Sequence, residues 1–505
     1  LRCLVGSEMC IRDSGRSDED RAESSWCNLR TEEYYFCRKA LRGGRTETRI
    51  FYHKGEMMDI DICSEYPTVQ LRKTLNVVGR ELEVLYPVGY PTIEIFDPDF
   101  YPCRIHSFKP DEKCRCSYEE KVTKKSIKLR LVEKYESMTR AEMDQYLDEF
   151  EGILMVDVKP SKCYHPVLPT FDTEKGKCIF GLEPIWRGVF CSPELKLALR
   201  MGYVVTKIYR ADRYKMSRSP WSGDGDGGIL GFFITMKIRS SGNMPMDRDE
   251  QRLMNEYYQT HFEMDLDFGD ANQWGLRPAA KLSAKILCNS AWGKHAESVD
   301  HEQVKVMNHK SWDGSTDQEL LFQSFDDGMN DMTGLVPMDN DYMLVKYKAN
   351  RKKNSPFLAK SYLPCAVFVP MYGRMMLYNV LNICGMRVVM CDTDSVKVVR
   401  PIEDPMMDQR KIEMGSYLGQ WEDESGRDPL VEFISLGTKT YGQKKASGKT
   451  SFKNKGVCLK RAHQKLINFD VAKEIYFDGK EVYVPQLVFQ CCLLYTSPSP
   501  RDISG

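Results

Sequence analysis

Residues 388–399, with the sequence VVMCDTDSVKVV, place two aspartates inside a mostly apolar segment. The β-branched runs on both sides predict a buried β-hairpin with Asp392 and Asp394 at its centre. Residues two apart on a strand share a face, so two buried carboxylates would repel each other unless a cation lies between them. The segment therefore predicts a rigid, partly dry hairpin that holds a divalent metal ion. An Asx turn without a metal ion is the alternative explanation of a D-T-D pair.

A second carboxylate ends the apolar strand predicted in MDIDICSEYPTV, residues 58–69. Pro67 cannot continue the interior of a sheet, so the chain must turn soon after Asp61. A carboxylate at such a strand end can hold a metal ion while Tyr66 faces a bound nucleotide. Asp59 shares the face of Asp61 and is the alternative ligand. A core aromatic is the alternative role for Tyr66.

A helix predicted in GLRPAAKLSAKILCNSAWGKHAE, residues 275–297, carries a basic stripe. Its members recur every four residues, at Arg277, Lys281, Lys285, Asn289 and Gly293. Like charges four residues apart destabilise an isolated helix, so the stripe indicates that a polyanion binds there. The glycine lets a ligand approach the backbone closely. The alternative, a solvated basic face, is weakened by a separate apolar face, expected at Ala280, Leu282, Ile286 and Trp292.

Charge is concentrated locally, although 72 Lys and Arg balance 72 Asp and Glu over the whole chain. From Lys439 to Lys465 there are nine basic residues and no acidic ones. On a strand, Lys439 and Tyr441 would point the same way and could bind a nucleic-acid duplex near its end. This basic block predicts phosphate neutralisation with some stacking, whereas a shorter run would be expected to be a solvated face.

Together these segments describe one chemistry. Three carboxylates from two distant segments can hold two divalent ions for in-line attack at a phosphorus atom. A lysine-rich helix can hold a triphosphate and stabilise charge on the leaving pyrophosphate. The basic block can hold the backbone of a primer and its template.

Four strings, DICSEYP, KILCNSAWG, CDTDS and KTY, occur in the order of the palm and fingers motifs of the family B DNA polymerases. The family patterns are D-x-x-S-L-Y-P, K-x-x-x-N-S-x-Y-G, D-T-D-S and K-x-Y. ALRGGRTE, residues 40–47, resembles the glycine-rich linker motif of the protein-primed branch. NSAWGK resembles the Trp-bearing form found in Maverick/Polinton elements, adinto-like viruses and linear plasmids. The resemblance covers residues 40–465.

The resemblance implies an α+β fold, a right-hand polymerase with an antiparallel-sheet palm, helical fingers and a small thumb. It implies a template-directed DNA-dependent DNA polymerase that uses two Mg²⁺ ions, with Mn²⁺ able to substitute, and that replicates a virus or mobile element by protein priming. Its partners would be primer–template DNA, deoxynucleoside triphosphates (dNTPs) and a terminal protein that primes synthesis. The alternatives are an RNA-primed family B enzyme, favoured if residues 296–357 hold no insertion fold, and an inactive DNA-binding remnant.

The resemblance also assigns roles to single residues. The catalytic carboxylates would be Asp61, Asp392 and Asp394, of which Asp61 and Asp394 would bind the metal ions. The nucleotide would be bound by Ser64, Tyr66, Lys281, Lys285, Asn289 and Gly293, with Tyr66 excluding a ribose 2′-hydroxyl. DNA would be bound by Gly43, Gly44, Arg45, Lys439, Tyr441, Lys444, Lys445, Lys453 and Lys455.

Three residues depart from the family patterns. Glu65 stands where Leu is usual, and it either points to solvent or perturbs metal binding. Trp292 replaces Tyr, and Lys281 stands where many relatives have Arg. A 3′–5′ exonuclease domain normally precedes the glycine-rich linker, whereas too few residues precede it here. We therefore expect a fragment without proofreading.

The expected organisation follows from these assignments. Residues 1–14 and 491–505 resemble translated sequencing adapters, and residues 15–40 would be the remnant of an upstream region. The linker into the palm would span 41–60, the palm with an insertion 61–246, the fingers 247–295, a second insertion 296–357, the rest of the palm 358–436 and the start of the thumb 437–490. No apolar run is long enough to cross a bilayer. The 18 cysteines, without CxxC spacing, fit a reducing compartment, the host nucleus or cytoplasm.

Overall fold

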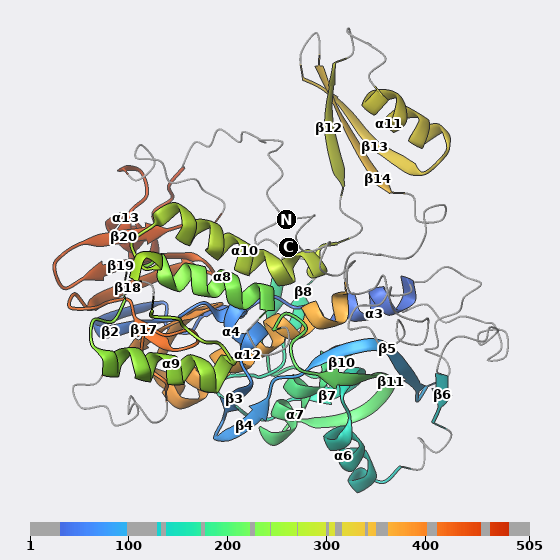
Figure 1. Cartoon of the computed structure of the whole chain (residues 1–505), viewed down its shortest axis with the longest axis horizontal. Coiled ribbons are helices and arrows are strands. Elements are labelled where there is room, and N and C mark those ends of the chain that lie inside the picture. The colour runs from blue at the N-terminus through green and yellow to red at the C-terminus, as the bar shows by residue number, and fades with distance from the viewer. Residues whose placement is uncertain are drawn as a thin grey trace.

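The computed structural model describes residues 31–97, 129–132, 138–172, 177–222, 228–242, 244–269, 271–298, 302–308, 316–338, 342–349, 362–400, 412–455 and 465–483. These residues form two large sheets with helices between and beside them, together with a smaller unit at one side (Figure 1). The mixture of helices and mainly antiparallel sheets confirms the predicted α+β class.

The larger sheet has eight strands and joins segments that lie far apart in the sequence. Its order is β1-β15-β16-β2-β18-β19-β20, with β17 also paired to β2. The strands are β1 (Thr46–Thr48), β2 (Tyr52–Ile62), β15 (Val388–Asp392), β16 (Ser395–Val399), β17 (Trp421–Asp423), β18 (Leu430–Gly437), β19 (Thr440–Lys445) and β20 (Thr450–Lys453). All of these pairs are antiparallel. Because β2 pairs with β16, β17 and β18, it is the strand around which the sheet is organised.

The second sheet has five strands in the order β10-β7-β11-β5-β6. They are β5 (Tyr86–Ile95), β6 (Leu129–Leu131), β7 (Gly152–Lys159), β10 (Ile185–Cys191) and β11 (Val204–Ser217). Helices α6 (Arg140–Glu149) and α7 (Ser192–Arg200) accompany this sheet, and two short hairpins are formed by β3 (Thr74–Val77) with β4 (Arg80–Glu83) and by β8 (Thr170–Asp172) with β9 (Lys177–Ile179). This sheet lies within the region where the sequence predicts an insertion into the palm.

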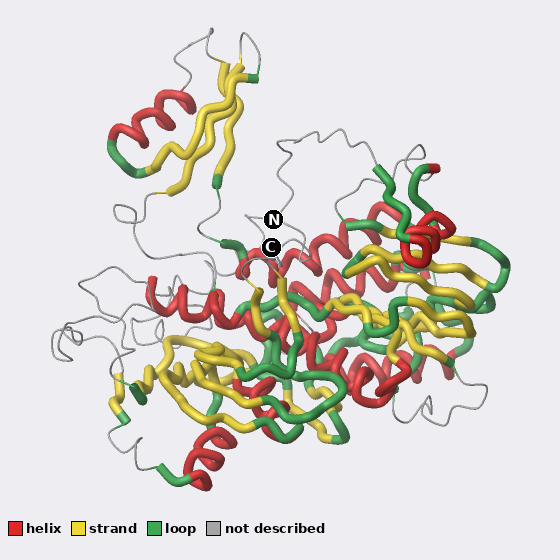
Figure 2. Tube along the Cα trace, turned by 180° about the vertical axis from the view of Figure 1, so that it is seen from behind, coloured by secondary structure: helices red, strands yellow, loops and turns green. Residues whose placement is uncertain are grey.

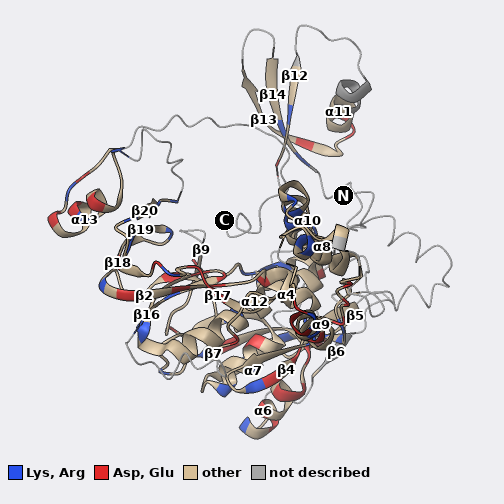
Figure 3. Cartoon of the chain, turned by 60° about the vertical axis from the view of Figure 1, so that its left-hand side comes forward, with Lys and Arg blue, Asp and Glu red and all other residues tan. Residues whose placement is uncertain are grey.

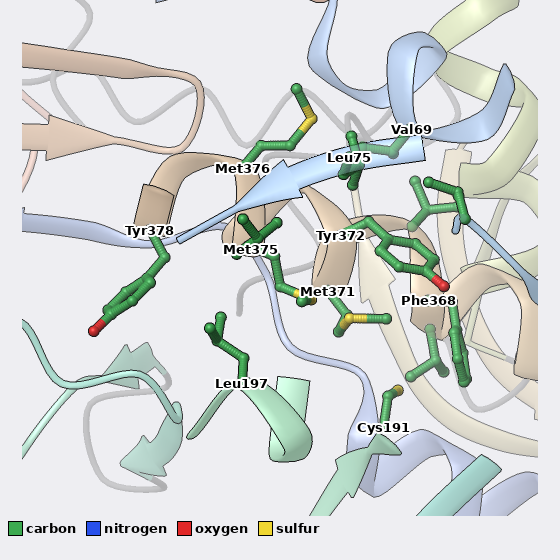
Figure 4. Packing of buried hydrophobic residues seen from close by; sticks show 14 of the residues in the cluster. Val69, Leu75, Cys191, Leu197, Phe368, Met371, Tyr372, Met375, Met376 and Tyr378 are labelled. Atoms are coloured by element: carbon green, nitrogen blue, oxygen red, sulfur yellow. The ribbon is translucent and has the colours of Figure 1, made fainter. Parts of the chain in front are cut away.

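Helix α12 (Leu363–Cys384) forms the centre of the hydrophobic core. Nearly all of its side chains are buried, and it ends where Gly385 adopts a positive φ before the 3₁₀ turn η4 (Gly385–Arg387). Figure 4 shows Phe368, Met371 and Tyr372 of this helix among other buried hydrophobic side chains, including Val69 and Leu197. Helix α3 (Thr31–Ala40) and helix α4 (Glu65–Leu71) also pack against α12. The core therefore joins the two large sheets into one body.

Three further helices follow the second sheet. They are α8 (Gly228–Arg239), α9 (Arg248–Phe262) and α10 (Pro278–Ala296), with a short 3₁₀ turn η3 (Ala271–Gln273) before the last. Helices α8 and α10 lie side by side above α4 (Figures 1 and 3). The sequence predicts that the fingers begin at residue 247, whereas α8 lies before that residue and packs against α10.

Residues 303–349 include a small unit that stands apart from the two large sheets (Figures 1 and 2). Its sheet has the order β12-β14-β13, from β12 (Gln303–Asn308), β13 (Asn330–Pro337) and β14 (Tyr342–Ala349), and helix α11 (Thr316–Asp326) packs on it. Met307, Leu321 and Val345 form its own core. The sequence predicts an insertion over 296–357, and this unit lies within that range.

Helix α13 (Phe469–Asp478) packs against β18, β19 and β20. The sequence predicts that the thumb begins at 437, yet β19 and β20 continue the palm sheet without a break. The domain boundaries therefore stay predictions. Residues 1–14 and 491–505, expected to be adapter-derived, lie outside the described residues. Within the described part of the chain, no helix combines the length and apolarity needed to cross a membrane.

Candidate active site

The D-T-D turn, Asp392 to Asp394, joins the ends of β15 and β16, the second and third strands in the order of the larger sheet. Asp392 is the last residue of β15 and pairs with Ser395, while Thr393 adopts a left-handed conformation with φ of 64°. The Asp394 N–H donates to the Asp392 carbonyl over 2.8 Å. The two aspartates therefore do not share one strand face as the sequence analysis assumed, because the turn separates them.

Asp61 lies beside Asp394. Ser395 and Asp61 are direct partners across β16 and β2, and the Ile62 N–H donates to the Asp394 carbonyl over 2.8 Å. Burial raises the pKa of Asp61 to about 7, and the Asp394 carboxylate acts in the same direction. The structure thus brings the two predicted metal ligands together from segments far apart in the chain.

Two glutamates that the sequence analysis missed add to this negative charge. Glu422 of β17 pairs directly with Asp61 across β2, and the Glu424 carboxylate also raises the pKa of Asp61. Both come from the string GSYLGQWEDE, in which Glu422 lies on β17 and Glu424 follows the end of that strand. The acidic residues of that string are the signal that could have identified them.

Asp392 has different neighbours. Its Oδ1 accepts a hydrogen bond from Thr46 Oγ1 over 3.0 Å and forms a salt bridge with Lys439 Nζ over 3.0 Å. Lys439 lies in the turn before β19 with φ of 61°, so it does not share a strand face with Tyr441 as predicted. Lys439 neutralises Asp392, whereas Asp394 lies next to another carboxylate.

Asp59, the alternative ligand, is also paired. Lys397, its direct partner across β16, forms an ion pair with it, and both side chains are buried. Burial lowers the pKa of Lys397, while Asp59 opposes that change. Because a lysine already compensates Asp59, the geometry favours Asp61 as the ligand.

The segment after Asp61 connects the palm to α8 and α10. Ser64 adopts a left-handed conformation with φ of 62° just before α4, and Lys237 of α8 donates a hydrogen bond to its hydroxyl. The ring centroids of Tyr66 and Trp292 lie 4.9 Å apart. Tyr66 is therefore supported by the helix opposite, and it is half-buried rather than part of the deep core.

Lys237 is a functional candidate that sequence reasoning missed. It lies in the mostly apolar segment GILGFFITMKIR and so has no periodic signal of its own. Burial lowers its pKa, and the neighbouring Lys285 and Lys281 act in the same direction. Three lysines thus gather at one place on α8 and α10, an arrangement that a polyanion would stabilise.

Helix α10 presents the predicted basic stripe. Lys281 and Lys285 are exposed, Asn289 is half-buried and Gly293 is buried. Lys285 lies close enough to Asp61 to oppose the rise in that carboxyl's pKa. Figure 3 shows basic segments on α10 and α8 at one side of the palm strands, and on β18 to β20 at the other.

The predicted apolar face of α10 is wrong for two of its members. Leu282 and Ile286 are 59% and 53% exposed. The buried face instead consists of Ala284, Cys288 and Trp292, spaced four residues apart, because α10 lies against α8 and α4 through that face.

The glycine-rich segment, residues 40–47, lies against the D-T-D turn. Arg45 is only 1% exposed, and its guanidinium donates to the Pro166 carbonyl over 2.6 Å and pairs with Glu47 over 2.6 Å. This burial contradicts the prediction that Arg45 contacts DNA, because all of its contacts lie inside the protein. Gly43 and Gly44 are half-buried beside it.

The predicted DNA-binding residues of the basic block have mixed environments. Tyr441 is 4% exposed and packs 5.7 Å from Phe433, so it is part of the core beneath this surface. Lys453 lies over the Tyr441 ring at 5.5 Å and is exposed, as is Lys455. Lys444 and Lys445 are half-buried and point to opposite faces of β19.

Glu65 is buried, which excludes the expectation that it points to solvent. Its Oε1 lies 2.6 Å from where a Cβ on Gly373 would stand, so only a glycine at that point of α12 leaves room for the carboxyl group. Its Oε2 has no hydrogen-bond partner among the described residues. Burial raises the pKa of Glu65 well above its ordinary value, and Asp394 and Asp61 add to the effect.

Six residues other than glycine have positive φ values in the described part of the chain, and three of them lie at this site. They are Ser64, Thr393 and Lys439, with φ values of 62°, 64° and 61°. Ser64 precedes Glu65, Thr393 lies between Asp392 and Asp394, and Lys439 pairs with Asp392. Such strain persists only where the surroundings hold it, and it is typical of functional sites.

The donor set fits a magnesium site. No group of three or more His, Cys, Asp or Glu side chains in the described ranges has metal-binding geometry. Mg²⁺, however, is commonly held by one or two carboxylates together with substrate phosphates. Asp61 and Asp394 provide two adjacent carboxylates, and burial together with the neighbouring carboxylates raises the pKa of Asp61.

Solved structures of phi29 DNA polymerase are similar to this chain. The ternary complex with primer–template DNA and incoming nucleotides gives a TM-score of 0.51 at 16% identity, covering 92% of this chain and 61% of that one. The binary complex with primer–template DNA gives 0.48 at 16% identity, covering 93% and 63%. The chain thus spans less than two thirds of the length of these polymerases. No protein-family model matches the sequence, and no curated protein matches it.

The superposition on the ternary complex confirms the predicted architecture of sheet-based palm and helical fingers. We conclude that this chain has the right-hand fold of a family B DNA polymerase.

Proposed function

We propose that the protein is a template-directed DNA-dependent DNA polymerase that joins deoxynucleotides with two Mg²⁺ ions. One observation carries the proposal: Asp61 and Asp394 meet at one end of the palm sheet, opposite a helix whose Lys285 lies within electrostatic reach of Asp61. The polymerase fold supports it, and the solved ternary complex similar in fold contains primer–template DNA and incoming nucleotides.

In this proposal each residue group has a distinct role. Asp61 and Asp394 would hold the metal ions, which when bound would activate the attacking 3′-hydroxyl and stabilise the leaving pyrophosphate. Lys285 and Lys281 would hold the triphosphate, with Asn289 and Gly293 shaping the pocket for the new base pair.

Lys237 fixes Ser64 by hydrogen bonding, and this contact keeps the nucleotide-facing segment against α8. Tyr66, supported by Trp292, would lie under the sugar and exclude a ribose 2′-hydroxyl.

DNA would be held on the surface of β19 and β20. Lys453 and Lys455 are exposed there, and Lys445 shares the face of Tyr441. Such lysines neutralise backbone phosphates without reading sequence. Tyr441 supports this surface from below, because Lys453 lies over its ring.

Protein priming is the finer part of the proposal. Its support is the glycine-rich segment, the Trp-bearing NSAWGK string and the small unit within residues 303–349. The absence of an insertion fold would have favoured an RNA-primed enzyme, and the small unit within residues 303–349 supports protein priming instead. A terminal protein of a virus or mobile element would then supply the priming hydroxyl group, and the reducing interior of a host cell stays the proposed location.

Primer extension with Mg²⁺ tests the function. We expect the wild type to extend a DNA primer on a DNA template and Asp394→Ala to give only background synthesis. Asp144→Ala, which removes an exposed aspartate on α6, is the matched control and should extend normally. If the wild type and Asp394→Ala extend equally poorly, the chain is an inactive remnant and the proposal fails.

A further inference from the structure

We propose that Gly44 is a positioning residue for the D-T-D turn, acting through Thr393 on Asp394. This inference rests on the proposed polymerase function and replaces the prediction that the glycine-rich segment serves to contact DNA. Three observations support it. They are the close approach of Gly44 to Thr393, the strain in the turn, and the contacts that anchor the glycine-rich segment to the core.

The first point is a close approach that only glycine permits. A Cβ on Gly44 would lie 2.5 Å from Thr393 Cγ2, 3.0 Å from Thr393 Cβ and 3.1 Å from Thr393 Oγ1. Real Cβ atoms essentially never show contacts below 3.0 Å. Gly44 has no positive φ, so this glycine is needed for space rather than for conformational freedom.

The second point is the strain in the turn. Thr393 is β-branched and holds a left-handed φ of 64°, which costs free energy for such a residue. Its N–H donates to the Arg45 carbonyl over 2.7 Å, so the segment that leaves space for the side chain also holds the backbone. On the other side, the Ile62 N–H fixes the Asp394 carbonyl over 2.8 Å. The turn is therefore held from both sides.

The third point is that the glycine-rich segment is itself anchored. Arg374 of α12 donates through Nη1 to the Arg42 carbonyl over 2.6 Å and the Gly43 carbonyl over 3.1 Å. The same guanidinium forms two 2.8 Å contacts with the buried Glu194 of α7. A continuous set of contacts thus runs from the core helices through the segment to the turn that carries Asp394.

This arrangement fixes Asp394 relative to Asp61. A shift of about 1 Å in a catalytic group can cost two orders of magnitude in rate, so a bulkier residue at position 44 should impair catalysis without removing any catalytic group. The expected defect is in the chemical step, since none of these contacts involves the lysines proposed to bind nucleotide or DNA.

The experiment introduces a steric clash with Gly44→Ala and then relieves it with a second substitution. Activity is measured by steady-state primer extension on the full chain. We expect Gly44→Ala to lower kcat at least about tenfold, while the KM for dNTP and the Kd for primer–template DNA change less than about twofold, which is well under 1 kcal/mol. Thr393→Ser in the Gly44→Ala background removes the closest atom, Cγ2, and should restore most of kcat. Gly181→Ala is the control glycine, because its nearest neighbour would be 3.9 Å away and its φ is not positive.

Three outcomes overturn the inference. They are full activity of Gly44→Ala, a loss of DNA affinity that accounts for its whole defect, and no rescue by Thr393→Ser. If Gly44→Ala does not fold, Thr393→Gly replaces it. Glycine at position 393 tolerates the left-handed φ but lacks the side chain that packs against Gly44, so kcat should fall several-fold. An unchanged kcat would again refute the positioning role.

A readout independent of activity separates this inference from the proposed function. Mn²⁺ affinity, measured by electron paramagnetic resonance, should weaken in Gly44→Ala and recover in the double variant. If the wild type does not extend primers but Mn²⁺ binding follows this pattern, the polymerase proposal fails while the positioning role stands. If the wild type is active and Mn²⁺ binding is unchanged in Gly44→Ala, the positioning role fails alone.

Discussion

Buried charges in this protein are of two kinds, and they lie within the same core. In the support region, Arg374 and Glu194 are each 3% exposed and share two contacts of 2.8 Å. Arg210 and Asp212 are paired in the same way, over 2.6 and 2.8 Å. At the candidate site, by contrast, Asp61 lies among carboxylates, and Glu65 has an oxygen without a hydrogen-bond partner among the described residues.

The difference shows which buried charges are compensated by other groups of the protein. A buried carboxylate with a bidentate arginine is compensated within the protein, so it serves architecture. Around Asp61, three carboxylates act against the single nearby Lys285, so a cation would stabilise this cluster. Excess negative charge around Asp61 is therefore a better marker of function here than burial or ion pairing as such.

The largest expected effect comes from breaking a support pair. Glu194→Ala leaves the Arg374 guanidinium buried without its carboxylate, which should lower the free energy of unfolding by about 3–5 kcal/mol. Urea denaturation followed by circular dichroism measures this change. The double variant Glu194→Leu with Arg374→Met removes both charges and should be less destabilised than Glu194→Ala. A single-variant cost below about 1 kcal/mol would contradict the architectural role.

The second test replaces an uncompensated charge. Glu65→Leu should raise the free energy of unfolding at pH 8 by about 1–3 kcal/mol, because it removes a buried carboxyl group that has an unpartnered oxygen. The pKa of Glu65 is raised well above its ordinary value, so the folded state binds that proton more tightly than the unfolded state. The wild type therefore loses stability as pH rises above the ordinary glutamate range, and the gain from the substitution should grow with pH.

Denaturation of Glu65→Leu at several pH values measures that trend. Glu65→Gln serves as control, since it keeps the volume and removes the charge. A gain that is the same at pH 4 and pH 8 would show that the charge is not the cause.

These contrasts also show what the sequence could predict. The motifs placed Asp61 at the end of a strand, Asp394 at the centre of a hairpin and Lys285 on the basic stripe of a helix, because these patterns are local properties of the sequence. The partners of Asp392 and Arg45 could not be predicted, since Lys439 and Pro166 reach them through tertiary packing.

The misplaced faces have the same physical cause. Leu282 and Ile286 were predicted to belong to an apolar face, whereas they are exposed because α10 packs through Ala284, Cys288 and Trp292 instead. Lys237 could not be identified because a single lysine in an apolar helix has no pattern. The local chemistry of the site was thus predictable, and its supports were not.

The third test uses the pH dependence of the cation-free site. The pKa of Asp61 is raised to about 7, so the folded state holds its proton through a range in which the unfolded state has lost it. Without divalent ions, stability should fall as pH rises from about 4 to about 7 and then level off. Because Asp61 is partly solvated, we expect a discounted effect of about 1–2 kcal/mol.

Added Mg²⁺ should recover this loss at pH 8 and have little effect at pH 5, since binding needs the deprotonated carboxylate. Thermal unfolding with and without Mg²⁺ at the two pH values measures the difference. Asp61→Asn should remove the share of the pH dependence that comes from Asp61, while the share from Glu65 stays, and it should remove the Mg²⁺ effect. If Mg²⁺ raises the melting temperature equally at both pH values, the ion acts elsewhere.

The smallest expected effect comes from breaking an exposed salt bridge, for comparison with the buried Arg374–Glu194 pair. Arg252 and Glu256 form a salt bridge of 3.0 Å on α9, but they are 61% and 57% exposed. Arg252→Ala should lower the free energy of unfolding by only about 0.2–0.5 kcal/mol, and less at high salt, because water and ions screen exposed charges. The same urea denaturation used for Glu194→Ala measures it. The exposed Arg252–Glu256 pair would then contribute roughly a tenth as much to the free energy of unfolding as the buried Arg374–Glu194 pair, although the distances in the two pairs are similar. If instead Arg252→Ala cost as much as Glu194→Ala, burial would not be what separates architectural charges from the rest, and the contrast between the support region and the site would lose its physical basis.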